Sequence, residues 1–154
     1  QIQYYFFSSI IPDSARYQLL TKAFEIARDM FPFGTGFATF GSYYSGVYYS
    51  SVYAAYGLSN INGLRIGASQ FISDSFWPMI LGQSGYFGLL SYIFAVTMLL
   101  KAIQRIRKVE NSYYAAAMSG ICYLIIVSMA ESAFVHPIAV PIAMMIGAFL
   151  GKCE

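Results

Sequence analysis

A long segment without any charged side chain limits most strongly what this chain can fold into. It runs from about Phe76 to Leu100. As a helix rising about 1.5 Å per residue, it would be about 36 Å long. That length crosses the hydrocarbon core of a bilayer with some tilt. The whole chain is 58% hydrophobic and only 10% charged, whereas soluble domains carry roughly 25% charged residues. The sequence therefore predicts an integral membrane protein or a piece of one.

Two further apolar segments, at about 113–130 and 133–150, predict two more membrane-spanning helices. Between the first two spans, residues 101–110 (KAIQRIRKVE) hold the densest cluster of basic side chains. By the positive-inside rule, this loop and the C-terminus are expected in the cytoplasm. The same rule puts residues 13–75 on the outer side of the membrane.

Glycine and proline positions add detail to these predicted spans. Gly82, Gly85 and Gly88 recur at intervals of three in the first span, which favours close helix–helix approach in lipid. Pro137 and Pro141 are expected to bend the third helix or delay its start.

The part before the first span is expected to be a loop in water. Residues 1–12 are apolar but too short to cross a bilayer, so they predict the end of an upstream span or an interfacial segment. Residues 13–30 predict an amphipathic helix with Asp13 or Ser14 as N-cap and Pro32 after its end. Its apolar stripe is assigned to Tyr17, Leu20, Ala23, Phe24 and Ala27. The chain begins without Met or a recognisable signal peptide, which favours the C-terminal part of a longer protein.

Tyrosines are concentrated after this helix. A helix is predicted over about 42–58, because four side chains recur at steps of four: Tyr44, Tyr48, Val52 and Tyr56. The rings and hydroxyls of Tyr44 and Tyr48 indicate either a groove for a polar, ring-shaped ligand such as a sugar or an aromatic belt at the membrane interface. Both interpretations stay open.

Several classes of site are not expected. The single histidine makes a multi-histidine metal site impossible within this sequence, and the two cysteines, Cys122 and Cys153, show no disulfide or metal-ligand spacing. The glycines at Gly34 and Gly36 lack the lysine of a phosphate-binding loop. No metal, no cofactor and no nucleic-acid partner are expected.

Three features, in this order, resemble the O-antigen polymerase and ligase superfamily. The segment SARYQLLTKAFEIARDMFPFGTGFATF is similar to that family's arginine-led amphipathic helix, proline and Gly-x-Gly. The segment SDSFWPMILGQSGYFGLL resembles the family's motif at the exit of its large periplasmic loop. Two hydrophobic spans then close the chain, as in the family.

The resemblance implies an all-α integral membrane protein, here the C-terminal part of a multi-span helical bundle with a periplasmic loop. It implies a glycosyltransferase of the bacterial inner membrane that moves saccharide units from a polyprenyl-diphosphate carrier to an acceptor sugar at the periplasmic face, without a cofactor. The expected partners are the carrier-linked oligosaccharide, membrane lipids and a chain-length regulator.

The resemblance also assigns residues. Arg16 matches the arginine that opens the family's loop helix. Asp74 stands where ligases carry a histidine, and Gln83 stands where they commonly carry a glutamate. These departures favour a polymerase of O-antigen or exopolysaccharide over an O-antigen ligase, which remains the alternative within the family.

The chemistry of glycosyl transfer agrees with these residue types. An arginine matches the oxygens of a leaving diphosphate, so Arg16 is the first choice for that role, with Arg28 and Arg65 next. Asp74 is the general base for the acceptor hydroxyl, the N-cap of the first span, or both. A rival of another class is a transport subunit such as a lipid-linked saccharide flippase. It would need charges inside its spans, whereas here the charges collect at the ends.

Overall fold

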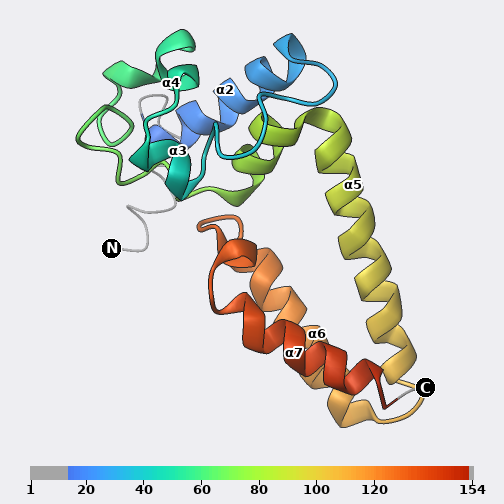
Figure 1. Ribbon diagram of the computed structural model, residues 1–154. Helices are drawn as coiled ribbons and strands as arrows, with labels where there is room; N and C mark the ends of the chain where they lie inside the picture. The colour runs from blue at the N-terminus through green and yellow to red at the C-terminus, as the bar shows by residue number, and fades with distance from the viewer. Residues whose placement is uncertain (1–13, 153–154) are drawn as a thin grey trace. The chain divides into compact units, whose positions relative to one another are not determined.

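The structure is a computed structural model that describes residues 14–152. This part of the chain is helical and contains no β-strand, so the prediction of an all-α fold is confirmed for it. The predicted segment 1–12 lies outside the described residues. The helices are α2 (Ala15–Asp29), α3 (Tyr43–Val47), α4 (Ser51–Ala55), η1 (Leu58–Asn60), α5 (Phe76–Ile106), α6 (Asn111–Val127), η2 (Ala133–Val135) and α7 (Ala139–Leu150) (Figure 1).

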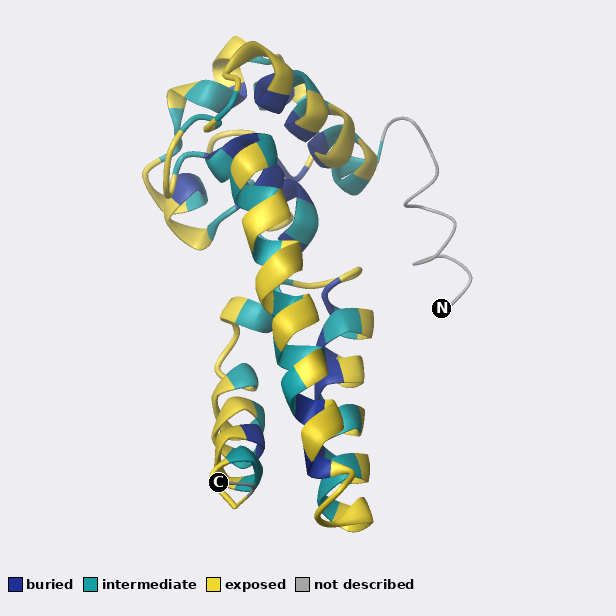
Figure 2. Cartoon of the chain, turned by 90° about the vertical axis from the view of Figure 1, so that its right-hand side faces the viewer, coloured by how far each residue is buried: buried dark blue, intermediate teal, exposed yellow. Residues whose placement is uncertain are grey.

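The chain divides into two compact units, and the boundary falls between Leu89 and Leu90, inside α5. Each unit has its own core of buried side chains, drawn dark blue in Figure 2. The first core is made of Leu19, Ala23, Ile26, Ala27, Phe40, Tyr53, Leu58, Leu64, Ile72 and Leu81. The second core is made of Ile103, Ile106, Ala117, Ile121 and Ile146.

Helix α2 begins where the sequence indicates, because Ser14 caps it. The Ser14 Oγ accepts a hydrogen bond from the Tyr17 N–H at 3.3 Å, which satisfies one of the unpaired donors of the first turn. The buried face of the helix consists of Leu19, Ala23, Ile26 and Ala27. The predicted stripe is therefore wrong in part, since Tyr17, Leu20 and Phe24 are 38%, 43% and 50% exposed. Helix α2 has two apolar faces, and the core covers one of them.

The single helix predicted over 42–58 is wrong, because the structure has two five-residue helices there. Tyr49 lies between them with φ 39°, a left-handed conformation that a continuing right-handed helix does not contain. Each short helix starts at a serine cap: the Ser42 side chain bonds the Ser45 N–H, and the Ser50 side chain bonds the Val52 N–H. Serine hydroxyls thus compete with the helix ladder that the tyrosine spacing predicts.

Helix α5 is interrupted at Gly85, whose φ of 64° and ψ of −165° are not helical. A segment that we call the aromatic turn, residues 31–37, fills this break. In an intact α-helix the Phe87 N–H would donate to the Gln83 carbonyl. Here the Gln83 carbonyl accepts from the Gly36 N–H at 2.9 Å, and the Phe87 N–H donates to the Pro32 carbonyl at 3.4 Å. The aromatic turn therefore provides a donor for the Gln83 carbonyl and an acceptor for the Phe87 N–H, the two groups that an intact helix would join to each other.

The glycines of α5 serve this contact with the aromatic turn. A Cβ on Gly85 would clash with the Pro32 carbonyl oxygen, and one on Gly82 would clash with the Phe40 ring. The close approach predicted from the glycine spacing exists at these two positions, but its partners are the aromatic turn and Phe40 rather than another membrane-spanning helix. Gly88 does not take part, since its neighbour is the Ser84 side chain of the same helix.

Helix α5 is long and apolar enough to cross a membrane, as the sequence predicts for its first span. It has 31 residues, and only 6% of its most apolar 18-residue window is buried inside the structure. This low burial separates it from the core helix of a soluble protein. It also extends beyond the predicted end at Leu100, so Lys101 and Arg105 lie on the helix and not in a loop.

The second unit packs α6 and α7 together, and both are shorter than predicted. Helix α6 has 17 residues and α7 has 12, or roughly 26 Å and 18 Å at about 1.5 Å per residue. The third helix starts at Ala139 instead of about 133, after the chain passes Pro137, as its prolines predict. Gly120 permits the close packing, because a Cβ there would lie 3.0 Å from the Ile142 side chain.

Candidate functional site

An ion pair joins two segments that are far apart in the sequence. The Arg16 Nη2 lies 3.7 Å from the Asp74 Oδ2. The side chains of Arg16 and Asp74 are 26% and 29% exposed, so both are reachable from solvent while most of their surface is covered. The two residues that sequence reasoning put forward for catalysis are therefore neighbours in the folded chain.

Helix boundaries explain how these two side chains meet. Arg16 lies in the first turn of α2, two residues after the Ser14 cap. Asp74 lies two residues before α5, whose first residue is Phe76. Ser75 is the one residue between Asp74 and this helix, so Asp74 stays next to the first turn of α5. The carboxylate of Asp74 lies beside the start of α2, within 3.7 Å of Arg16.

The position of Arg16 is electrostatically unusual. A cation in the first turn of a helix faces the positive end of the helix dipole, and this costs about 0.3–1 kcal/mol. The Asp74 carboxylate offsets that cost. An incoming anion such as a phosphate would be attracted by both the guanidinium and the helix N-terminus, and it would compete with Asp74 for them.

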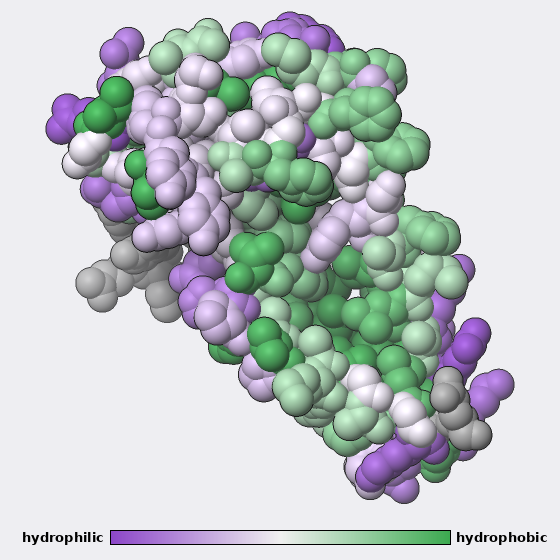
Figure 3. Space-filling view, in the orientation of Figure 1, coloured by the Kyte–Doolittle hydropathy of each residue, from purple (hydrophilic) through white to green (hydrophobic). Residues whose placement is uncertain are grey.

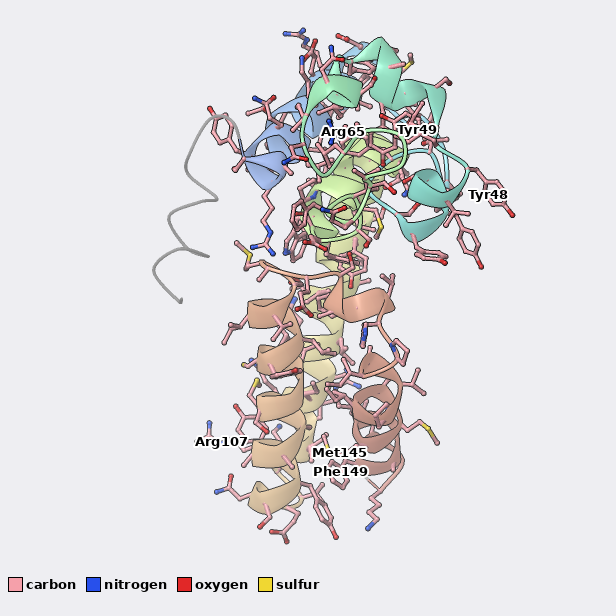
Figure 4. All side chains as sticks on the ribbon, turned by 90° about the vertical axis from the view of Figure 1, so that its left-hand side faces the viewer. Tyr48, Tyr49, Arg65, Arg107, Met145 and Phe149 are labelled. Atoms are coloured by element: carbon pink, nitrogen blue, oxygen red, sulfur yellow. The ribbon has the colours of Figure 1, made fainter. Side chains whose placement is uncertain are left out.

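Arg28 and Arg65 do not share this place. Arg28 lies at the opposite end of α2, about 18 Å from Arg16 along an axis that rises about 1.5 Å per residue. Its partner is the adjacent Asp29, 3.4 Å away, and its side chain is 75% exposed. Arg65 is exposed on a turn, where its backbone forms an isolated bridge with Ala68 (Figure 4). The structure thus gives neither arginine an ion pair with Asp74.

A pocket of about 280 Å³ opens in the same unit. Its lining comes from two stretches of the chain: Ser42, Tyr43, Gly46 and Val47 from the first, and Ser69, Gln70, Ile72 and Ser73 from the second. Hydroxyl and amide groups beside an exposed tyrosine ring suit a saccharide, which presents hydroxyls at its edge and C–H groups on its face. Ser73 directly precedes Asp74, so the pocket wall leads into the ion pair.

The tyrosines chosen from the sequence lie beside this pocket rather than in its wall. Tyr44 and Tyr48 stack on each other, with ring centroids 6.5 Å apart and planes 11° apart. They are 60% and 81% exposed, and Figure 4 shows Tyr48 projecting away from its unit. Tyr43 was not singled out, yet it lines the pocket and packs edge-on against Tyr44 at 5.6 Å. The spacing of four that singled out Tyr44 and Tyr48 skips Tyr43. That spacing also assumes a single helix over 42–58, which the structure does not contain.

Two buried polar side chains hold the loops of this unit in place, and sequence reasoning gave neither a structural role. The Tyr53 hydroxyl accepts from the Gly41 N–H at 2.8 Å and pairs with the Ser45 hydroxyl at 2.8 Å. Burial raises the pKa of Tyr53 above its ordinary value. The Gln83 side chain accepts from the Ala38 N–H at 3.1 Å and donates to the Phe40 carbonyl.

The Gln83 amide makes a hydrogen bond that an ionised glutamate could not make. A carboxylate can only accept hydrogen bonds, so an ionised glutamate at this position would lose the bond to the Phe40 carbonyl. In this chain the residue is 8% exposed and clamps the segment after the aromatic turn onto α5. Its place in the fold is structural.

The donor set for metal ions is sparse: within residues 14–152 there is no group of three or more His, Cys, Asp or Glu side chains that would hold one. The geometry instead combines one arginine, one carboxylate and a hydroxyl-lined pocket in a single compact unit. Comparisons of the chain with protein-family models, with curated proteins and with solved structures give no match.

Proposed function

We propose that this chain is the C-terminal part of a bacterial inner-membrane polysaccharide polymerase. It transfers saccharide repeat units from a polyprenyl-diphosphate carrier to an acceptor sugar at the periplasmic face. The observation that carries the proposal is the 3.7 Å ion pair between Arg16 and Asp74, because the fold joins a phosphate-binding cation to a carboxylate from a segment remote in sequence. Helix α5, which is long and apolar enough to span a bilayer, supports the membrane location.

In the proposed reaction the acceptor hydroxyl oxygen attacks the anomeric carbon of the carrier-linked sugar. The hydroxyl proton passes to the Asp74 carboxylate. The bond from the anomeric carbon to the diphosphate oxygen breaks, and its electron pair leaves with the polyprenyl diphosphate. The new negative charge develops beside the Arg16 guanidinium, which stabilises it.

The proposed acceptor site is the pocket whose lining includes Ser73, the residue before Asp74. Its hydroxyl and amide side chains, Ser42, Ser69, Gln70 and Ser73, would bind the edges of a sugar ring. Tyr43 would cover the apolar face of that ring, and the Tyr44–Tyr48 pair would extend the same surface to a second sugar. The acceptor end would then be held one residue away from the proposed base.

The test measures polymer formed from the carrier-linked repeat unit by membranes that contain the protein. Arg16→Ala is expected to lower the rate by about 10²–10³-fold, as loss of one oxyanion-stabilising group does. Asp74→Asn is expected to lower it by about 10²–10⁴-fold, with a much smaller effect of Ser75→Ala. Lys22→Ala is the matched control, because it also removes an ion pair from α2, the 2.7 Å contact with Glu25. It should leave the rate unchanged.

A charge exchange distinguishes catalysis from support of the fold. The double variant Arg16→Asp with Asp74→Arg can restore an ion pair between the same two positions. If the pair only holds α2 against the start of α5, this variant should regain polymer formation. We expect it to stay inactive while reaching the membrane in normal amounts, and recovery of normal chain length would remove both residues from the site.

The material that accumulates in the inactive variants identifies the class of reaction. A polymerase defect leaves single repeat units on their carrier at the periplasmic face. A ligase defect leaves finished polymer on its carrier, and a flippase defect leaves repeat units at the cytoplasmic face. We expect the first result, and either of the others would contradict the proposal.

A further inference from the structure

The aromatic turn, residues 31–37, exposes large apolar rings that its own unit does not cover. Phe31 is 72% exposed, Phe33 is 68% exposed and Phe37 is 90% exposed. The sequence from Met30 to Phe40 contains no charged residue. The space-filling view shows hydrophobic side chains gathered over this turn, at the end of α2 (Figure 3). Three exposed rings on one short turn are unusual for a surface that faces only water.

The backbone of the turn is prepared for an apolar environment. Inside a bilayer each unpaired N–H or carbonyl is costly, so an inserted turn needs internal partners. The N–H groups of Thr35 and Gly36 donate to α5 carbonyls at 3.0 Å and 2.9 Å, and the Ala38 N–H donates to the Gln83 side chain. The Thr35 hydroxyl also bonds the Gly82 carbonyl at 3.1 Å. The rings can therefore leave water without exposing these donors to lipid.

The turn is also fixed at one particular place on α5. Gly34 lies so close that a Cβ there would be 2.5 Å from the Gly82 carbonyl oxygen. The Phe31 ring lies 6.5 Å from the Tyr86 ring, and the Phe33 ring lies 6.0 Å from the Phe87 ring. Phe87 is the first exposed large side chain of α5, and the helix then runs without a charge to Leu100. The turn is thus attached where the apolar, uncovered part of α5 begins.

The second apolar face of α2 belongs to the same surface. Tyr17, Leu20 and Phe24 recur at helical spacing and are exposed. They run along α2 toward the turn that follows it. An amphipathic helix of this kind lies in the plane of a membrane with such a face toward the acyl chains. The occupant that fits a long apolar face, a ring-bearing turn and the start of a spanning helix together is a lipid bilayer.

We propose that the aromatic turn inserts into the outer side of the membrane interface beside α5 and holds α2 flat against the bilayer. Its rings lie among the upper acyl chains, while Arg16 at the far end of α2 stays at the level of the lipid headgroups. The diphosphate of a membrane-bound carrier is found at that level. The insertion itself does not depend on glycosyl transfer, and only this last consequence rests on the proposed function.

The experiment uses the position of a single tryptophan in the full chain reconstituted in phosphatidylcholine vesicles. Trp77 is the only tryptophan, so Trp77→Phe provides a silent background for Phe37→Trp. The matched control is Tyr48→Trp in the same background, because Tyr48 is also strongly exposed, at 81%, and lies in the same unit. Fluorescence is measured with brominated acyl chains as the lipid quencher and with iodide as the aqueous quencher.

We expect bromine near the upper part of the acyl chain to quench the indole at position 37 strongly and iodide to quench it weakly. The control at position 48 should show the opposite pattern. The proposal would be overturned if iodide strongly quenched the indole fluorescence at position 37 and the brominated lipid did not reduce it. Resistance to both quenchers would also overturn it, because it would mean that protein, either a second copy or another partner, covers the turn.

A second measurement covers the case in which these tryptophan variants fold poorly. Phe33→Asp and Phe37→Asp place a charge on the turn without touching its hydrogen bonds to α5. In hydrogen exchange on vesicle-bound protein, both should speed exchange along residues 17–24 of α2 and leave α6 unchanged. No change at residues 17–24 would contradict a role of the rings in holding α2 on the membrane.

Discussion

Replacing Gly34 by alanine should loosen the aromatic turn from α5 far more than a glycine replacement normally does. Gly34 has φ +70°, where an alanine is strained, and its added Cβ would lie 2.5 Å, 2.7 Å and 2.8 Å from backbone atoms of Gly82, Gly85 and Gln83. Backbone atoms cannot rotate away as a side chain can. The turn would therefore have to withdraw from the break in α5.

The chain provides a closely matched control. Gly57 has φ +72°, nearly the same as Gly34, but a Cβ there would meet nothing within 4 Å. Gly57→Ala suffers only the strain of the left-handed conformation, about 1–2 kcal/mol. Gly34→Ala suffers the same strain and also gives up the backbone bonds that join the turn to Gly82, Gln83 and Phe87. At about 1 kcal/mol per bond, its total cost is about 4–5 kcal/mol.

Thermal unfolding in detergent, followed by far-ultraviolet circular dichroism, would measure the difference. For a chain of this size about 1 kcal/mol shifts Tm by roughly 2–4 °C. Gly57→Ala should therefore lower Tm by about 2–8 °C, and Gly34→Ala should lower it by about 8–20 °C. Hydrogen exchange gives the local result: the amides of Thr35 and Gly36 should exchange faster in Gly34→Ala and remain protected in Gly57→Ala. Equal Tm shifts with both amides still protected would refute this reasoning.

Other perturbations of the same unit have defined outcomes. Tyr53→Phe leaves the Gly41 N–H without its acceptor and should lower the free energy of unfolding by about 1–3 kcal/mol. Since burial raises the pKa of Tyr53 above 10.0, its stabilising effect is complete below pH 10.0 and is lost as pH rises above that value. The wild type should therefore lose more stability than Tyr53→Phe in alkaline denaturant titrations, and parallel curves would contradict the assignment. Gln83→Glu removes the donor to the Phe40 carbonyl and should lower Tm at neutral pH, with partial recovery in acid as the side chain is protonated. Tyr43→Ala should raise the acceptor KM in the polymer assay with little change in kcat, while Tyr44→Ala, outside the pocket wall, should change it less.

The features predicted best from the sequence are those that depend on local pattern alone. A capping serine and a following proline predict α2 to within two residues of its observed ends. An uncharged run predicts α5, and Pro137 accounts for the late start of α7. Each of these signals acts over a few neighbouring residues, so no knowledge of the rest of the fold is needed to interpret it.

Prediction fails where a distant segment decides the outcome. The core takes the Leu19 and Ile26 face of α2 because the loops and α5 pack there, and no periodicity distinguishes that face from the neighbouring face with Leu20 and Phe24. The tyrosine spacing over 42–58 predicts one helix, but Tyr49 turns away from the helix and donates its hydroxyl to the Leu64 carbonyl at 2.9 Å. Such a bond is visible only after the chain has folded.

In the candidate site, too, local sequence predicts the residue types and distant contacts decide their arrangement. Arginine and aspartate were chosen by chemical type and by resemblance, and their 3.7 Å separation follows from the packing of α2 against the segment before α5. The pocket wall was missed because its residues come from α3 and from the segment 69–73, which meet only in the folded chain, where Gly46 lies beside the Ile72 and Ser69 side chains. Buried tyrosines in a serine-rich stretch are the signal that would have indicated a folded loop.

The break at Gly85 means that the conformation of α5 depends on residues outside the helix. As an isolated peptide in a bilayer, α5 should form continuous helical hydrogen bonds through residues 82–87 and become straight. The N–H groups of the aromatic turn would no longer be there to bind the Gly82 and Gln83 carbonyls. Within the chain, the Gln83 carbonyl and the Phe87 N–H are bonded to Gly36 and Pro32 instead. The interruption therefore depends on contacts with residues 32–36, and α5 grafted into another scaffold without them should form a straight helix.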